Sequence, residues 1–153
     1  MENPLERDTQ AITKYKELYQ KIGLNCCIYC GKLIKGEEYH LDHFLPWCRM
    51  PVDRFWNLYL ACKECNLKKS DRILILNETL IGNIKKHLKS CIKELLKEQA
   101  LVARDLKLLY KQTFNSEYEY YNSEQITEEI IEYLRNLSMN LLDIIPEHVF
   151  SVT

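Results

Sequence analysis

The 153-residue sequence lacks the long apolar runs and terminal signals that would assign it to a membrane or an export pathway. No stretch approaches the roughly 18 consecutive apolar residues of a membrane span. The segment from Met1 to Asp8 has no apolar core and does not have the shape of a signal peptide. Internal repeats and low-complexity tracts are also absent. We therefore expect a cytoplasmic protein with no membrane contact.

The sequence has almost no net charge, −1, but its charges are unevenly distributed. Residues 68–111 hold eleven Lys or Arg against five Asp or Glu, a surplus of six positive charges. Residues 114–153 hold one Arg against eight acidic residues, a surplus of seven negative charges. This split indicates either two solvated helix faces or a basic surface for nucleic acid followed by an acidic surface. The acidic part would then dock a basic partner or shield the basic helix by self-association.

Seven cysteines, an odd number in a sequence without an export signal, favour thiolates that bind metal over disulfides. Four of them form two C-x2-C pairs separated by 31 residues: Cys27, Cys30, Cys62 and Cys65. Closely paired thiolates are the ligands of a closed tetrahedral zinc site. Cys26 competes with Cys27, but its spacing to Cys30 is one residue wider, so we prefer Cys27. Cys48 and Cys91 are interpreted as residues that only fill space.

A second set of polar residues is interleaved with the cysteine pairs: Asp42, His43, Asn57 and Asn66. Carboxylate and amide oxygens suit a hard divalent cation, and an imidazole near neutral pH suits a general base. Successive side chains of a strand point to opposite faces, so Asp42 and His43 converge only if the strand ends or bulges there. Pro46 follows closely and favours a strand end.

Helical spacing of apolar residues brackets the cysteine-rich segment on both sides. The first helix is predicted to begin at Asn3, before a proline, and to end at Gly23. Asn77 is predicted to cap a long helix that runs to about Gln112. A loop over residues 114–122 is expected to precede a last helix over 123–144. Between the first two helices the period is lost, and short strands are expected near residues 39–44 and 57–61.

Three segments of the sequence resemble the zinc-containing HNH endonucleases: residues 40–46 (HLDHFLP), 56–58 (WNL) and 62–71 (CKECNLKKSD). The resemblance covers roughly residues 24–75. It implies a ββα-metal finger, in which His43 is the general base and Asp42 and Asn66 bind the catalytic cation. In that family Asn57 would orient the loop that carries the base.

Asn66 stands where many members of that family have histidine, so the chain resembles an H-N-N variant. The amide favours Mg²⁺ or Mn²⁺ over softer metals. Lys68, Lys69 and Arg72 follow at the start of the finger helix, where we expect them to contact DNA phosphates.

The predicted fold class is α+β, a small zinc-bound ββα-metal finger embedded in a mostly helical chain. We divide the sequence into an N-terminal helix (1–23), an HNH nuclease domain with structural zinc (24–76), and a helical C-terminal region (77–153). At this length one packed core is expected.

Three functions are compatible with these residues. The first is a metal-dependent DNA endonuclease that acts alone or as a homo-oligomer. The second is a catalytically silent zinc module that binds nucleic acid or a protein. The third is an effector nuclease held inactive until a partner docks on the C-terminal region. Small HNH proteins similar to this one often act beside an ATPase in bacterial defence or mobile elements, which is an analogy from the family alone.

Overall fold

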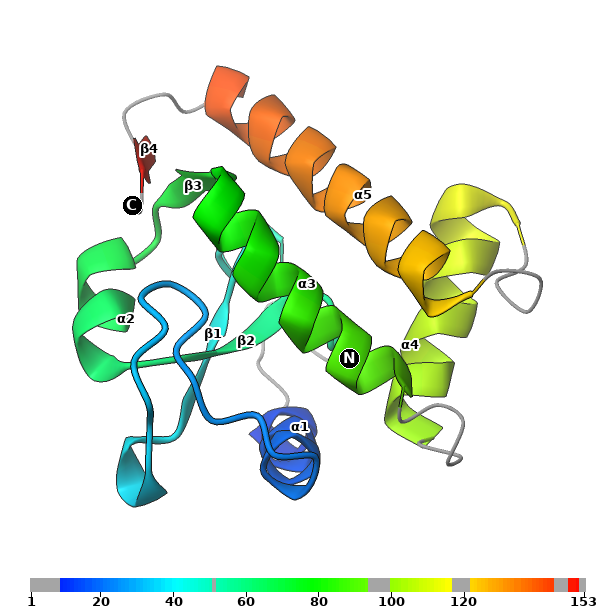
Figure 1. Cartoon of the computed structure of the whole chain (residues 1–153). Coiled ribbons are helices and arrows are strands. Elements are labelled where there is room, and N and C mark those ends of the chain that lie inside the picture. The colour runs from blue at the N-terminus through cyan, green and yellow to red at the C-terminus, as the bar shows by residue number, and fades with distance from the viewer. Residues whose placement is uncertain (1–8, 51, 94–99, 117–121, 145–148, 152–153) are drawn as a thin grey trace, which may run out of the picture.

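The computed structural model describes residues 9–50, 52–93, 100–116, 122–144 and 149–151. Its elements in chain order are α1 (Thr9–Lys21), η1 (Gly36–Glu38), β1 (His40–His43), β2 (Leu58–Ala61), α2 (Lys63–Lys69), β3 (Ile73–Ile75), α3 (Glu78–Lys93), α4 (Ala100–Leu109), η3 (Tyr110–Phe114), α5 (Ser123–Ile144) and β4 (Val149–Ser151). The structure has two small two-stranded sheets: β1 and β2 lie among α1, α2 and α3, whereas β3 and β4 lie at the edge of the molecule (Figure 1). The predicted α+β class is confirmed. None of the described helices is both long and apolar enough to cross a membrane.

The ββα unit is built from β1, β2 and α2. The two strands are antiparallel, with His40 opposite Ala61 and His43 opposite Leu58. Cys62 follows β2 directly, and its sulfur accepts a hydrogen bond from the backbone N–H of Cys65, which caps the first turn of α2. The predicted strand–strand–helix order is therefore present, and Cys62, one of the predicted zinc ligands, lies at the junction of β2 and α2.

The helix that precedes this unit ends as predicted. Gly23 has a φ of +82°, a left-handed conformation that glycine adopts without steric cost. The backbone N–H of Leu24 donates to the carbonyl of Tyr19 at 2.9 Å, which satisfies one of the last free carbonyls of α1. The predicted start at Asn3 lies outside the described residues.

The long helix predicted after Asn77 is correct at its start and corrected further on. Asn77 caps α3, since its side-chain oxygen accepts from the N–H of Leu80 at 2.8 Å. The structure then has two described helices, α3 and α4, which run in different directions in Figure 1. The reason is packing: Val102 and Leu106 of α4 are fully buried in the same core that α3 contacts, which one straight helix would not allow.

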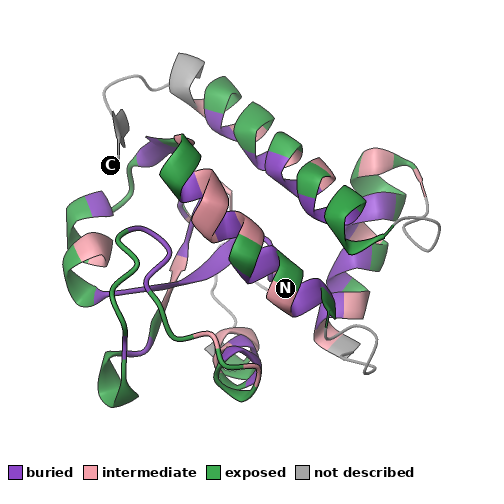
Figure 2. Ribbon diagram, viewed as in Figure 1, coloured by how far each residue is buried: buried purple, intermediate pink, exposed green. Residues whose placement is uncertain are grey.

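One hydrophobic core crosses all three predicted segments. It includes Tyr19 of α1, Leu58 of β2, Ile84 of α3 and Ile130 of α5. The acidic helix α5 packs along the basic helix α3, with their buried faces turned toward each other (Figure 2). The division at residues 23 and 76 stays a prediction about the sequence, but hydrophobic packing continues across both positions.

A buried carboxylate ties α4 to the ββα unit. Asp105 is fully buried and accepts hydrogen bonds from the hydroxyl of Tyr15 and from the backbone N–H of Phe55, the latter at 3.0 Å. Arg104 lies 3.2 Å and Arg54 3.8 Å from the other oxygen. Burial raises the pKa of Asp105 although these partners oppose the shift. The hydrogen bonds from Tyr15 and Phe55 therefore connect α1 and the β1–β2 loop to α4 through the Asp105 side chain.

Asp105→Ala should lower the free energy of unfolding by about 1–3 kcal/mol, because the Tyr15 hydroxyl and the Phe55 N–H would remain buried without an acceptor. Urea unfolding followed by circular dichroism measures the change. Asp105→Asn keeps one acceptor oxygen and should lose less. Glu128→Ala removes an exposed carboxylate from α5 and serves as the control. A loss for Asp105→Ala no larger than the control would contradict the role of this carboxylate.

Candidate zinc centre and active site

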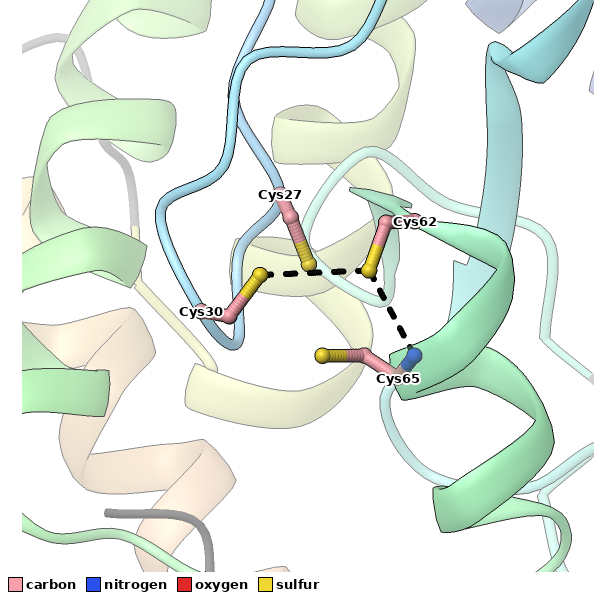
Figure 3. Close-up of side chains that lie close together, drawn as sticks. All are labelled: Cys27, Cys30, Cys62 and Cys65. Carbon is pink, nitrogen blue, oxygen red and sulfur yellow. Dashed lines mark hydrogen bonds between the residues drawn. The ribbon is translucent and has the colours of Figure 1, made fainter.

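The four predicted zinc ligands lie together. Their sulfur atoms are all within 4.8 Å of one another, and the sulfurs of Cys30 and Cys62 are 3.8 Å apart. Figure 3 shows Cys27 and Cys30 on the loop after α1, facing Cys62 and Cys65 at the start of α2. Zinc at roughly 2.3 Å from each of four tetrahedral sulfurs would space them by about 3.8 Å. The donor set and its spacing therefore fit zinc.

The electrostatics of this cluster also favour a cation. Burial raises the pKa of the Cys62 thiol, but hydrogen bonds from the Cys65 N–H and neighbouring thiols outweigh it and leave that pKa below its usual value. Burial and the nearby thiols raise the pKa of Cys65, and burial also raises that of Cys27. Four thiolates repel one another at this distance unless a divalent cation lies between them.

His43, the predicted general base, is the last residue of β1 and is nearly buried. Its Nε2 lies 2.6 Å from an Oδ1 of Asp53, and both side chains are 9% exposed. The ring of Trp47 meets the imidazole edge-on, with 5.5 Å between ring centroids. His43 is thus confined on two sides by the loop that joins β1 to β2.

Asn57, the predicted loop-orienting residue, holds that same loop. Its side chain is fully buried, and its Oδ1 accepts from the N–H of Leu45 at 2.8 Å. Its amide donates to the carbonyls of Leu45 and Val52, at 3.3 and 3.2 Å. The backbone carbonyl of Asn57 also accepts from Phe44. One residue therefore closes both ends of the β1–β2 loop around His43.

Asp42 and His43 make separate contacts, as the alternation of strand side chains requires. The Asp42 carboxylate accepts a hydrogen bond from the hydroxyl of Tyr29 and lies 3.1 Å from the ammonium of Lys69. Burial and the nearby carboxylate raise the pKa of Tyr29, so its hydroxyl stays a donor. Both of these contacts are made to Oδ2 of Asp42.

The structure corrects the assignment of Lys69 as a phosphate contact. Its side chain is 1% exposed, and its ammonium donates to the carbonyl of His43 at 2.8 Å in addition to pairing with Asp42. A buried cation held by two groups cannot reach the DNA backbone without leaving both. Its neighbours Lys68 and Arg72 are exposed, so they remain the candidates for phosphate contacts on this side.

Asn66 is half-buried in α2, three residues before Lys69. Residues three apart lie on the same side of a helix. Asn66 therefore shares one side of α2 with Lys69, whose ammonium lies 3.1 Å from the Asp42 carboxylate. Its amide oxygen is the second donor that the sequence predicts for a hard cation.

Two residues of this site were not predicted from the sequence, Asp53 and Tyr29. Asp53 lies ten residues after His43 in an irregular loop, and no spacing rule relates the two. Tyr29 lies inside the first C-x2-C pair, where only the metal ligands carry a recognisable pattern.

Residues 27–74 match the family model of the HNH endonucleases. This segment, about a third of the chain, is therefore an HNH endonuclease domain, and it contains the four cysteines and both strands of the ββα unit. The resemblance found in the sequence is confirmed. Neither curated proteins nor solved structures give a match to the chain.

Protein purified without chelator should contain one zinc ion per chain, bound by the four cysteines. Cys30→Ser should lose the zinc and unfold the finger, because a closed thiolate site contributes binding energy on the order of 10 kcal/mol. Elemental analysis and circular dichroism measure both effects. Cys48→Ser, at an exposed cysteine outside the cluster, is the control. The assignment fails if the wild-type protein contains no zinc.

Adjacent lysines distinguish a phosphate contact from a buried ion pair. Lys68→Met should weaken DNA binding and reduce the salt dependence by roughly one unit of slope. Lys69→Met should instead lower the free energy of unfolding by about 3–5 kcal/mol, since it leaves the Asp42 carboxylate without its buried partner. A salt titration of DNA binding and urea unfolding of both variants provide the data. If Lys69→Met is as stable as Lys68→Met, the buried pair contributes nothing to folding.

Proposed function

We propose that this protein is a metal-dependent endonuclease that hydrolyses DNA phosphodiester bonds. The observation that carries the proposal is the placement of His43 inside a domain of the HNH endonuclease family. The imidazole is held by Asp53 and Trp47 at the end of β1, and Asn57 fixes the loop around it. A histidine held in this way can take a proton from a water molecule that attacks phosphorus.

Asp42 and Asn66 would hold the catalytic cation, which we propose to be Mg²⁺ or Mn²⁺. Their carboxylate and amide oxygens are donors that these ions prefer over zinc. When bound, the cation would polarise the phosphate and stabilise charge on the departing oxygen. The Lys69 ammonium offsets the negative charge of the Asp42 carboxylate, and the Tyr29 hydroxyl fixes the orientation of that carboxylate.

DNA would be positioned by exposed cations in the last turn of the finger helix α2, just after it, and on α3. Lys68 and Arg72 flank the buried Lys69, and Lys86 and Lys93 are exposed on α3. Phosphate contacts of this kind fix the position of a duplex without reading its sequence.

The role in defence or mobile elements, and a partner such as an ATPase, rest on family resemblance alone and stay proposals. The charge split supports them less than the sequence suggests. The acidic helix α5 packs on the basic helix α3, and Lys89 lies 3.6 Å from Glu124. Part of the opposite charge is therefore paired within the chain. We also propose a reducing cytoplasm, because the four cysteines must remain thiols to bind zinc.

His43→Ala should reduce plasmid nicking in Mg²⁺ or Mn²⁺ by about 10²–10⁴-fold, because the general base is removed. Zinc content and DNA affinity should stay close to those of the wild type. The matched control is His40→Ala, an exposed histidine on the same strand. Equal nicking by His43→Ala and wild type would refute the active-site assignment.

Two further arms of this assay separate the remaining functions. Asn66→Ala should lose activity that excess Mn²⁺ partly restores, because only the cation affinity is weakened. Asn57→Ala should give an intermediate rate, since it loosens the loop around His43. If the wild-type protein fails to nick DNA with every metal and every neighbouring gene product tested, the silent zinc module becomes the better description.

A further inference from the structure

Asp53 is a nearly buried carboxylate that contacts the imidazole of the proposed base, His43. It lies in the β1–β2 loop with its Oδ1 2.6 Å from Nε2 of His43. An ionised carboxylate only accepts hydrogen bonds, so the nitrogen opposite it must carry the proton. A neutral imidazole has one N–H, and placing it on Nε2 leaves the lone pair on Nδ1.

We propose that Asp53 is a positioning residue that holds His43 in the tautomer protonated on Nε2, so that Nδ1 is the atom that accepts the proton from water. This inference rests on the proposed endonuclease function and assigns the reacting atom of its base. In the reaction the water oxygen forms a bond to phosphorus while its proton moves to Nδ1. The P–O bond to the leaving group breaks with its electron pair on the ester oxygen, which takes up a proton from solvent. The carboxylate keeps its own charge and remains hydrogen-bonded to Nε2 throughout.

Asp53 can do this because the backbone on either side of it is anchored. The carbonyl of Val52 accepts from the Asn57 amide at 3.2 Å, and the N–H of Phe55 donates to Asp105 at 3.0 Å. The N–H of Asn57 also donates to the carbonyl of Arg54 at 2.9 Å. A carboxylate on a segment held at these points has little freedom to leave His43.

The ring of His43 is held from a second direction as well. Trp47 meets it edge-on, with 5.5 Å between the ring centroids, which restricts rotation about the bond to the ring. Asp53 holds Nε2 and Trp47 limits rotation of the ring, so the direction in which the Nδ1 lone pair points is fixed. A base in a fixed orientation accepts a proton faster than one that must first rotate.

The tautomer can be observed directly, without measuring activity. Histidine labelled with ¹⁵N gives separate signals for protonated and unprotonated ring nitrogens, and the four histidines are assigned with His43→Ala as the reference. Spectra are recorded at a pH where the signals are those of neutral rings. Wild-type His43 should show the proton on Nε2. In Asp53→Asn the amide can donate to Nε2, so His43 should shift toward the tautomer protonated on Nδ1.

Nicking kinetics of the same proteins test the consequence. Asp53→Asn should lower kcat by about 10²–10⁴-fold with KM and zinc content unchanged, because the same exchange in an Asp–His–Ser triad gives the wrong tautomer at a cost of about 10⁴. Asp53→Glu keeps an acceptor and should recover part of kcat. Glu37→Gln, which removes an exposed carboxylate on η1, should behave as the wild type.

The outcomes separate this inference from the proposed function. If Asp53→Asn keeps the proton on Nε2, the inference is overturned, whether or not the variant cleaves. A tautomer shift without loss of kcat, in a wild type that nicks DNA, would also overturn it. If the wild type does not nick DNA at all, the endonuclease proposal fails, and a wild-type proton on Nε2 that moves in Asp53→Asn would still establish the pairing.

Discussion

The close approach of four cysteine sulfurs is the constraint on which the geometry of the finger depends. The knuckle at Cys27 and Cys30 and the turn at Cys62 and Cys65 come from segments more than thirty residues apart in the sequence. A cation such as zinc, once bound, would convert the repulsion of the thiolates into a link between the two segments. That link would fix where α2 begins, and therefore where Asn66 and Lys69 lie relative to β1.

Electrostatic pairing then orders the residues along β1. Strand alternation sends Asp42 toward Lys69 and Tyr29, and sends His43 toward Asp53 and Trp47. Asp42 therefore has a buried cation beside it, and His43 has a carboxylate. Two adjacent residues of one strand thus lie next to charged groups of opposite sign. In the function we propose, this separation would let Asp42 bind a hard cation while the adjacent His43 acts as the base.

The features that the sequence predicts well are those set by local chemistry. Gly23 ends α1 because only glycine adopts its φ easily, Asn77 begins α3 because its side chain caps the helix, and the cysteine pairs have the spacing of metal ligands. The direction of α4 and the burial of Lys69 could not be predicted in this way. Both depend on contacts between residues far apart in the sequence, and in the sequence Lys69 looks the same as exposed Lys68.

Asp105 of α4 connects the helical region to the β1–β2 loop. It lies fifty residues beyond Phe55 in the sequence and accepts a hydrogen bond from the Phe55 N–H. Asp105 also lies outside the segment that matches the endonuclease family, so the hydrogen bonds of the domain extend beyond that segment. A finger cut out at its family limits and grafted onto another protein would carry the four cysteines and His43, but not the Asp105 carboxylate that anchors the β1–β2 loop. The HNH domain of this chain is therefore not structurally self-contained, because part of its support belongs to the helices that follow it.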